Sequence, residues 1–579
     1  MKRLSNREIA DKLEETGELY QMQGVQFKPR AYERAAGEVA AFGQNVADLF
    51  KAKGKRGLRE IPGVGPGIAD HIAALLTKGE FSEHKKLAKK TPVKVHELTR
   101  IENVGPMTAR RLYEKLGVRS VADLRKAVKA GKLRKAGFSA KMEGKIGKGL
   151  KFLKATDDRK ILGYILPTAE RFLERIRAIK GVKRASITGS ARRAEETIGD
   201  MDFIATSSDS KGAMEAFAHF PEVTEVIDRG REMTTVRLKN GMHADLMVVP
   251  DDAYGAILHH FTGGKDHNIQ LRTLALKKGL MLNEFGLWKG KKRIAARTEE
   301  EIYAKMGLPF IPPEIRTGEG EIEAAKAGKL PTLIPYGSVR GDLQVQTKWT
   351  DGHGTIAEMA AAAKKLGREY LAVTDHTKAL AFIHGLDAKK VAAQGREIDK
   401  VNAKMRGFTV LKGSECDILK DGSLDLDDRT LGSLDFVGAS VHSHFKLSAE
   451  AQTARVIAAM KNPHVDAIFH LTGRKIGKRP PIDLDILEIL KAAKATHTLM
   501  EIDAYPDRSD LRDEHVRMAV QLGVKLVIDT DAHEERHLKY LDLGVAIARR
   551  GWAEKRDVIN TKPLRELMRW LKTPKGKRH

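Results

Sequence analysis

The clearest alternation of apolar and polar positions lies near residue 200 and predicts two strands. Residues 182–188 are typical of a strand that runs into a Gly-Ser turn, and in 200–203 two acids alternate with apolar residues. Because strand side chains point alternately to the two faces, Asp200 and Asp202 share one face while their neighbours enter a core.

A third acidic strand follows. Residues 242–249 are apolar apart from one acid, Asp245, and an Asn-Gly turn pairs them with residues 234–239 as a hairpin. In-line phosphoryl displacement is well served by two divalent cations, which prefer oxygen ligands. We therefore expect Asp200, Asp202 and Asp245 to be catalytic metal ligands.

The Gly-Ser-Ala-Arg-Arg sequence at 189–193 lies between the first two strands. Its backbone amides and the Ser190 hydroxyl can face a triphosphate, and Arg193 adds a forked cation. Alone, an Asp-x-Asp pair would indicate an exposed strand edge and Gly-Ser an ordinary turn. Together with the third acid they predict nucleotidyl transfer.

The amino-terminal quarter is helical in pattern and basic. Residues 1–150 hold 32 lysines and arginines against 17 acids, an excess of 15 within a formal charge of +26, which indicates a polyanionic partner. Residues 61–67 and 101–106 are Gly-rich repeats that each open a helical segment. Such turns can aim backbone amides at a phosphate. The candidate DNA-binding residues are Gly63, Gly65, Gly67, Asn103 and Gly105.

From about residue 337 to 570, apolar strand-like runs alternate with Ala-rich helical stretches, which predicts a barrel of parallel strands. The runs are 370–373, 409–411, 436–439, 467–469, 499–502 and 525–528. Histidine, glutamate or aspartate follows most of them, where such barrels place their sites. Imidazole and carboxylate suit zinc and manganese, so these strand ends predict a metal site.

Residues 259–278 form a glycine-rich bend followed by a helical pattern. Together with the Gly-Ser turn and the three acids, this segment resembles the corresponding parts of the family X DNA polymerases. The resemblance covers about residues 1–316 and implies that the three acids hold two Mg²⁺ or Mn²⁺ ions. It also implies a deoxynucleoside triphosphate site with contacts to the phosphates, the sugar and the base pair. Its residues would be Gly189, Ser190, Arg193, Phe261, Thr262, Gly263, Asn268 and Arg272. The family's repair member has Tyr-Phe where this chain has His260-Phe261, so ribose discrimination is open.

The glycine repeats resemble helix-hairpin-helix motifs, which hold DNA without reading its sequence. In the repair polymerase a lysine of the first such helix forms a Schiff base with the deoxyribose phosphate. Here that position is His71, which argues against lyase chemistry through this residue.

The carboxyl-terminal region resembles the PHP domain (polymerase and histidinol phosphatase), which binds up to three metals and cleaves phosphodiesters. The implied ligands of Mn²⁺ or Zn²⁺ are Asp351, His376, Glu415, His442, His470, Asp531 and His533. The family's first motif carries two histidines where this chain has Gln344 and Gln346, poor ligands for zinc or manganese. We therefore expect a weakened or lost 3'-5' exonuclease.

These features predict a multidomain α/β and α+β protein with a mixed-sheet palm and a distorted, TIM-like barrel. The expected parts are a helical domain with the first hairpin (1–90), a second hairpin subdomain (91–155), the palm (156–250), a nucleotide-binding subdomain (251–316), a Pro- and Gly-rich linker (317–336), the PHP barrel (337–570) and a solvated basic tail (571–579).

We expect a DNA-directed DNA polymerase that fills short gaps in base-excision or break repair, acting as a monomer on gapped or nicked duplex DNA. A non-templated nucleotidyltransferase and a DNA-end-binding scaffold with decayed sites are the alternatives. The single cysteine, Cys416, excludes an internal disulfide, and no apolar run has membrane-spanning length. Both observations favour the cytoplasm.

Overall fold

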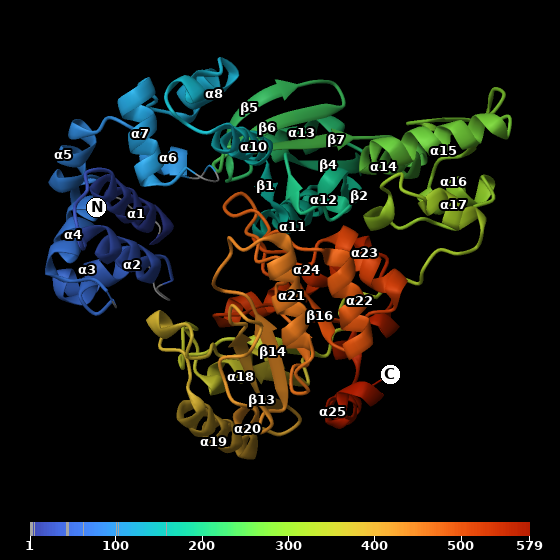
Figure 1. Ribbon diagram of the computed structural model, residues 1–579. Coiled ribbons are helices and arrows are strands. Elements are labelled where there is room, and N and C mark those ends of the chain that lie inside the picture. Colours follow the sequence, from blue (N-terminus) through green and yellow to red (C-terminus); the bar gives the residue numbers. More distant parts are fainter. Residues whose placement is uncertain are drawn as a thin grey trace. The chain divides into compact units, whose positions relative to one another are not determined.

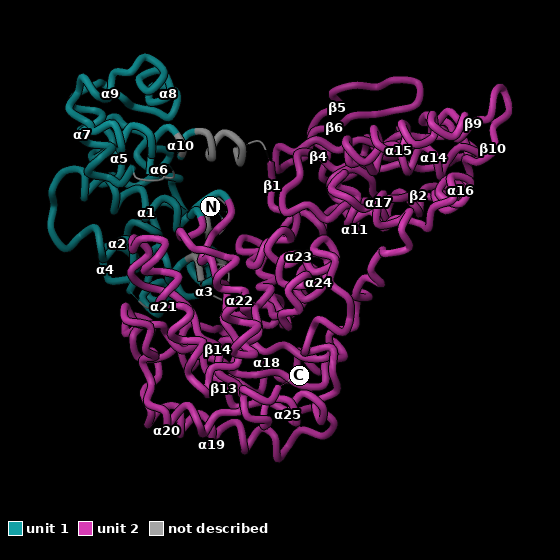
Figure 2. The backbone as a smooth tube through the Cα atoms, turned by 45° about the vertical axis from the view of Figure 1, so that its right-hand side comes forward, with its two compact units in different colours: residues 1–158, 477–480 teal, residues 159–476, 481–579 magenta. Residues whose placement is uncertain are grey.

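The computed structural model describes residues 4, 6–41, 46–61, 63–99, 101, 104–157 and 159–578. The chain forms two compact units, one of residues 1–158 with 477–480 and the other of residues 159–476 with 481–579 (Figure 2). Among the described residues, no helix is both long enough and apolar enough to cross a membrane.

The first unit is helical and has its own core. Its helices are α1 (Asn6–Met22), α2 (Lys28–Ala41), α3 (Val46–Leu58), α4 (Pro66–Lys78), α5 (Ser82–Lys90), α6 (Val95–Thr99), α7 (Pro106–Leu116), α8 (Val121–Lys129), α9 (Lys132–Lys135) and α10 (Ala140–Asp157). The internal repeat has a structural counterpart, because α4 and α7 each begin with proline after a glycine N-cap and each end at a left-handed glycine.

A five-stranded mixed sheet begins the second unit (Figure 1). It has the order β2 (Val182–Ile187), β4 (Asp200–Ser207), β7 (His243–Val248), β6 (Met233–Leu238), β5 (Val223–Arg229). Helices α11 (Leu162–Ala178) and α13 (Ser210–Ala218) pack their apolar sides into the sheet's core, where Phe172 of α11 lies 6.1 Å from Phe203 of β4 between ring centroids. The short strands β1 (Lys160–Ile161) and β3 (Thr197–Ile198) pair separately.

The next part combines helices with a three-stranded sheet. It contains α14 (Tyr254–Thr262), α15 (Lys265–Lys277), β8 (Met281–Asn283), β9 (Gly286–Lys289), β10 (Lys292–Ala295), α16 (Glu299–Lys305) and α17 (Glu321–Lys326). Helix α17 lies in the segment 317–336 that we expected to be a linker. Its Ile322 and Ala325 are buried in the same cluster as Leu271 of α15, so this stretch is packed onto the subdomain.

Seven parallel strands form the barrel in sequence order. They are β11 (Gly341–Val345), β12 (Tyr370–Val373), β13 (Thr409–Asp417), β14 (Phe436–Ser440), β15 (Ala467–Ile468), β16 (Leu499–Asp503) and β17 (Leu526–Asp529). A parallel bridge between Val345 and Ala532 joins the first strand to the chain after the last. The predicted fold class is thus confirmed. The apolar pattern did not identify β11 because it carries Asp342 and Gln344 in a buried strand.

Helices that lie between the strands in sequence, and two that follow the last strand, cover the barrel. They are α18 (Ile356–Lys365), α19 (Ala388–Lys404), α20 (Asp428–Leu431), α21 (Ala449–Met460), α22 (Ile486–Thr496), α23 (Asp513–Leu522), α24 (Leu541–Arg550) and α25 (Leu564–Lys572). Their inward faces form the clusters that pack against the strands.

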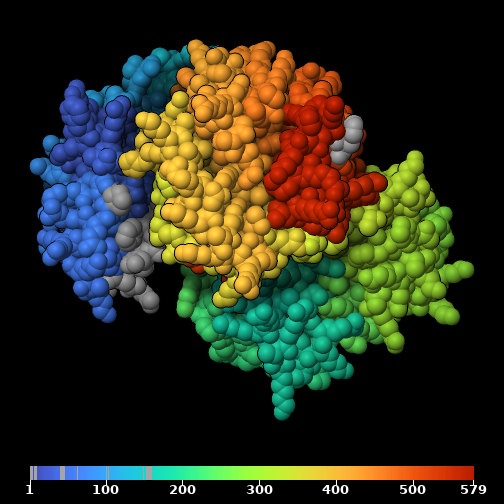
Figure 3. Space-filling model, turned by 90° about the horizontal axis from the view of Figure 1, so that it is seen from below, coloured from blue at the N-terminus to red at the C-terminus, as the bar shows by residue number. Residues whose placement is uncertain are grey.

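The basic tail does not extend into solvent as we expected. Arg578 is buried, pairs with Asp466 at 2.7 Å and lies over the ring of Trp570, while Lys575 donates to the carbonyl of Met460 at 2.6 Å. Figure 3 shows the red carboxyl-terminal segment packed on the orange part of the barrel. These contacts therefore attach the tail to the barrel.

We expect Arg578→Ala to destabilise the barrel by about 3 kcal/mol, because it leaves the buried Asp466 carboxylate without its cation. Calorimetric unfolding of the full chain measures the effect as a lower transition temperature. Arg565→Ala, which removes an exposed arginine of α25, is the control. Equal transition temperatures for the two variants would contradict the role given to Arg578.

Candidate functional site

The Gly-Ser turn and the acidic strand are in close contact. Gly189 has a φ of 61°, and the backbone N–H of Thr188 donates to the carbonyl of Asp202 at 2.8 Å. A Cβ at position 189 would lie 2.1 Å from Oδ2 of Asp202. Glycine is therefore needed both for the left-handed backbone and for the approach of the carboxylate.

The three predicted acids come together on neighbouring strands. Asp202 of β4 is in register with Asp245 of β7, and ligand atoms of Asp200, Asp202 and Asp245 lie within 4.8 Å of one another. Burial, followed by the charges of Asp200 and Asp245, raises the pKa of Asp202 to about 7. Such crowded carboxylates bind divalent cations well, because a cation removes the repulsion between them.

Both arginines of the turn reach Thr262 at the end of α14. The Arg193 guanidinium donates to the Thr262 carbonyl and pairs with Glu195. The Arg192 guanidinium donates to Thr262 Oγ1 at 2.6 Å and to Glu299 at 2.5 Å. Thus the turn predicted to hold the triphosphate is fixed against the residues predicted to line the sugar.

The two residues predicted to touch the base pair, Asn268 and Arg272, both contact His260. Asn268 Nδ2 donates to the His260 carbonyl at 2.9 Å, and Arg272 lies 3.0 Å from His260 Nδ1. Burial and the Arg272 charge lower the pKa of His260, so its neutral ring can accept from Arg272. Phe261 is 39% exposed, and Gly263 has a φ of 73°.

The hairpin residues of the first unit fall at helix starts. Gly63 has a φ of 74°, Gly65 and Gly105 are the N-caps of α4 and α7, and Gly67 lies in the first turn of α4. Asn103 lies outside the described residues. The amino termini of these two helices therefore present backbone N–H groups of the kind that bind phosphate.

His71 is held by aromatic neighbours. Its Nδ1 lies 2.6 Å from the Tyr32 hydroxyl, and its ring stacks on Phe81 with centroids 4.6 Å apart. Burial lowers its pKa. The residue at the lyase position is thus a packed, neutral imidazole.

Glu415 is the centre of the barrel's candidate metal site. Its carboxylate is buried and approaches His470 Nε2 at 2.7 Å, His442 Nε2 at 3.3 Å and His376 Nδ1 at 3.3 Å. Although burial acts in the opposite direction, the three histidines hold the pKa of Glu415 well below its usual range. Glu415 and Asp417 in turn raise the pKa of His442 to about 9 against the effect of burial.

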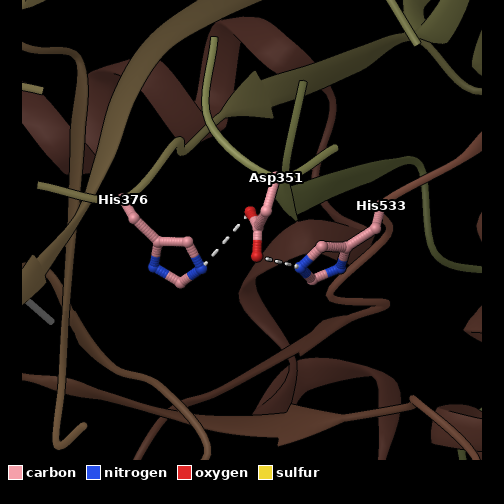
Figure 4. Close-up of side chains that lie close together, drawn as sticks. All are labelled: Asp351, His376 and His533. Atoms are coloured by element: carbon pink, nitrogen blue, oxygen red, sulfur yellow. Dashed lines mark ion pairs between the residues drawn. The ribbon is translucent and has the colours of Figure 1, made fainter. Parts of the chain in front are cut away.

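A second group of candidate ligands, drawn in Figure 4, shares His376 with the first. Asp351 lies between two histidines, with its oxygens 3.7 Å from His376 Nε2 and 3.4 Å from His533 Nε2. All three side chains follow the carboxyl ends of barrel strands. Imidazole and carboxylate atoms at these distances fit a transition metal or zinc.

The two glutamines break the metal pattern as the sequence indicated. Gln346 Nε2 donates to Glu415 Oε2 at 2.9 Å, so an amide N–H faces an atom that would otherwise bind metal. Both amide atoms of the fully buried Gln344 lack hydrogen-bond partners among the described residues. Five of the seven other candidate ligands form two groups whose atoms are close enough to hold a metal, namely Asp351, His376, Glu415, His442 and His533. His470 instead contacts Glu415, and Asp531 pairs with Arg508.

Several buried charges at the same end of the barrel were not identified from the sequence. Arg508 Nε lies 3.1 Å from Asp531 and 3.3 Å from Asp503, and Glu501 is buried two residues before Asp503. The alternation of acids with apolar residues at the end of β16 is a signal that would have found Glu501 and Asp503. Nothing local in the sequence indicates that Arg508 turns back to Asp531.

Three family models match the chain. They are the DNA polymerase beta thumb over residues 257–317, a helix-hairpin-helix domain over 4–81 and a SAM-like helix-hairpin-helix tandem over 95–151. The matches cover both hairpin regions and the segment around α14 to α16.

Among curated proteins, the DNA polymerase/3'-5' exonuclease PolX of Bacillus subtilis is 35% identical over 552 residues, which cover 94% of this chain and 95% of that protein. DNA polymerase lambda of Arabidopsis thaliana is 25% identical over 54% of the chain and 62% of its own length. A probable phosphatase of Acetivibrio thermocellus is 32% identical over 31% of the chain and 73% of its own length. The chain therefore belongs to the family X DNA polymerases that carry a carboxyl-terminal PHP domain.

Proposed function

We propose that this polymerase fills short gaps in duplex DNA by two-metal nucleotidyl transfer at Asp200, Asp202 and Asp245. The observation that carries the proposal is that these acids converge beside the glycine turn at 189. The pairing of β4 with β7 holds Asp202 and Asp245 side by side before any ligand arrives.

The three carboxylates would hold two Mg²⁺ or Mn²⁺ ions, which activate the primer 3' hydroxyl and stabilise charge on the phosphates. Gly189, Ser190 and Arg193 would bind the triphosphate and face the leaving pyrophosphate. Phe261, Thr262 and Gly263 would line the sugar. Asn268 and Arg272 would contact the base-pair side, where His260 fixes their orientation.

The first unit would hold the DNA. The two helix starts at Gly65 and Gly105 supply backbone donors for the phosphates, and the excess of 15 positive charges over residues 1–150 adds long-range attraction. Contacts to phosphates do not depend on the base sequence of the DNA, as gap filling at random lesions requires. Lyase chemistry through His71 is not part of the proposal, because that imidazole is packed against Tyr32 and Phe81.

The barrel would act as a weakened metal-dependent 3'-5' exonuclease. Glu415 with His376 and His442, and Asp351 with His376 and His533, are two groups able to hold Mn²⁺ or Zn²⁺. Gln344 and Gln346 would leave the third position of the cluster without its imidazoles.

Asp200→Ala is expected to lower gap filling on the order of a thousandfold, because the charge stabilisation that the metals provide is lost. Extension of a 5'-labelled primer in a gapped duplex measures the rate, and fluorescence anisotropy measures DNA binding, which we expect to be unchanged. Asp228→Ala, which removes an exposed acid of β5, is the control. Extension by Asp200→Ala at the wild-type rate would refute the assignment of the metal ligands.

Gly189→Ala is expected to abolish most extension, because its methyl group displaces the carboxylate of Asp202. Gly241→Ala is a matched control: its φ is 82°, but no heavy atom lies within 4 Å of an added Cβ. Both variants carry the backbone penalty of about 1 kcal/mol. If their extension rates fall equally, the close approach of residue 189 to Asp202 is not the reason for the glycine.

Gln344→His with Gln346→His is expected to raise the rate of primer shortening and the amount of bound Mn²⁺, because two imidazoles replace the amides, one of them beside Glu415. The test uses an Asp200→Ala, Asp202→Ala background without nucleotide, and elemental analysis counts the metal. The Asp200→Ala, Asp202→Ala variant with both glutamines in place is the control and measures the exonuclease activity of the native barrel. No gain in either metal content or shortening would show that the glutamines do not limit the site.

A further inference from the structure

Helix α24 of the barrel belongs to the cores of two neighbouring parts of the second unit. Its Leu541 and Val545 are buried in the barrel's own cluster, whereas Leu543 is buried in the cluster of the five-stranded sheet. In Figure 1 the helix lies next to α11. Helix α24 thus contributes one apolar side chain, Leu543, to the core of the polymerase sheet.

The approach of α11 to this helix is very close. A Cβ at Gly163 of α11 would lie 2.6 Å from Leu543 and 2.8 Å from Pro506. Such a distance leaves no space for a side chain. Glycine at position 163 therefore lets α11 pack directly against Leu543 of α24.

The last residue of α24 extends this contact to the triphosphate turn. Arg550 donates from one terminal nitrogen to the carbonyl of Arg193 at 2.9 Å, while its Nε and other terminal nitrogen lie 2.8 Å and 2.6 Å from Asp513 Oδ2. Its side chain is 14% exposed. Asp513 of α23 thus orients the guanidinium, which binds the backbone of the polymerase turn.

The bonded carbonyl lies at a strained point of the chain. Ala194, the next residue, has a φ of 52°, a region that costs a non-glycine residue about 1 kcal/mol. Glu196, two residues further on, pairs with Arg474 of the barrel. Arg474 also donates to the carbonyl of Arg508 at 2.8 Å, so it is fixed from both sides. One barrel arginine therefore binds the last carbonyl of the Gly-Ser-Ala-Arg-Arg turn, and a second pairs with the Glu196 side chain three residues later.

We propose that Arg550 is a positioning residue for the polymerase reaction, through which the barrel holds the turn that binds the incoming deoxynucleoside triphosphate. This rests on the proposed role of Gly189, Ser190 and Arg193. Arg550 touches no substrate; its bond keeps Arg193 in the conformation in which the turn can receive the phosphates. The barrel is then required for nucleotide binding even where its own metal site is incomplete.

The test is steady-state gap filling by the full-length chain with Arg550→Ala and Arg550→Lys. Arg550→Ala should raise the KM for the triphosphate about three- to tenfold, less than the full value of one charge-assisted hydrogen bond because Arg550 acts on the triphosphate only through Arg193, with a smaller change in kcat. Lysine keeps a positive charge but lacks the rigid fork that binds both Asp513 and the Arg193 carbonyl. Arg550→Lys should therefore raise the KM above the wild-type value, but less than Arg550→Ala does. Arg429→Ala, an exposed arginine of α20, controls for charge.

Binding of a non-hydrolysable triphosphate to the enzyme–DNA complex gives a second readout, and it should weaken by the same factor as the KM rises. Unchanged KM and triphosphate affinity in both Arg550 variants would overturn the proposal, as would an equal effect of Arg429→Ala. If the alanine variant does not fold, the lysine variant decides by the same criteria. Failure of the proposed polymerase function can be told apart from failure of the Arg550 proposal, because in the first case the wild-type chain would not extend the primer.

Discussion

Buried carboxylates that need a positive charge are the constraint on which both candidate sites depend. In the polymerase sheet, strand pairing forces Asp202 and Asp245 together, and burial raises the pKa of both. In the barrel, the parallel strands all direct their carboxyl ends to one side, where acids accumulate. Either arrangement is costly unless cations, protons or hydrogen-bond donors neutralise it.

The two sites offset the cost of burying neighbouring carboxylates in different ways. The polymerase acids have few internal donors and are thus suited to ions that arrive with the nucleotide. The barrel supplies much of its own compensation, since three histidines surround Glu415, and His533 and Arg508 lower the pKa of Asp531 against the effect of burial. The buried strand end that carries Gln344 and Gln346 therefore lies beside acids whose charge the protein itself largely compensates.

Motifs with fixed local spacing could be predicted from the sequence. Alternation placed Asp200 and Asp202 on one face, and the hairpin brought Asp245 beside them, because both effects act over a few residues. Long-range contacts could not be predicted in this way. Arg578 lies in a basic tail by composition, and only the fold shows that it is buried and pairs with Asp466. Strand β11 was missed because its polar residues are buried by the closure of the barrel, which no local window contains.

The same distinction explains why the contact between the barrel and the polymerase turn was not foreseen. Arg193 and Arg550 are 357 residues apart in the chain, and no local pattern links them. Their bond depends on the fit of Leu543 against Gly163, which lets α11 pack directly against α24. A barrel that has lost part of its metal cluster would still be retained if its helices hold the polymerase turn. Selection for nucleotide binding would then act on α23 and α24 rather than on the glutamines at the mouth of the barrel.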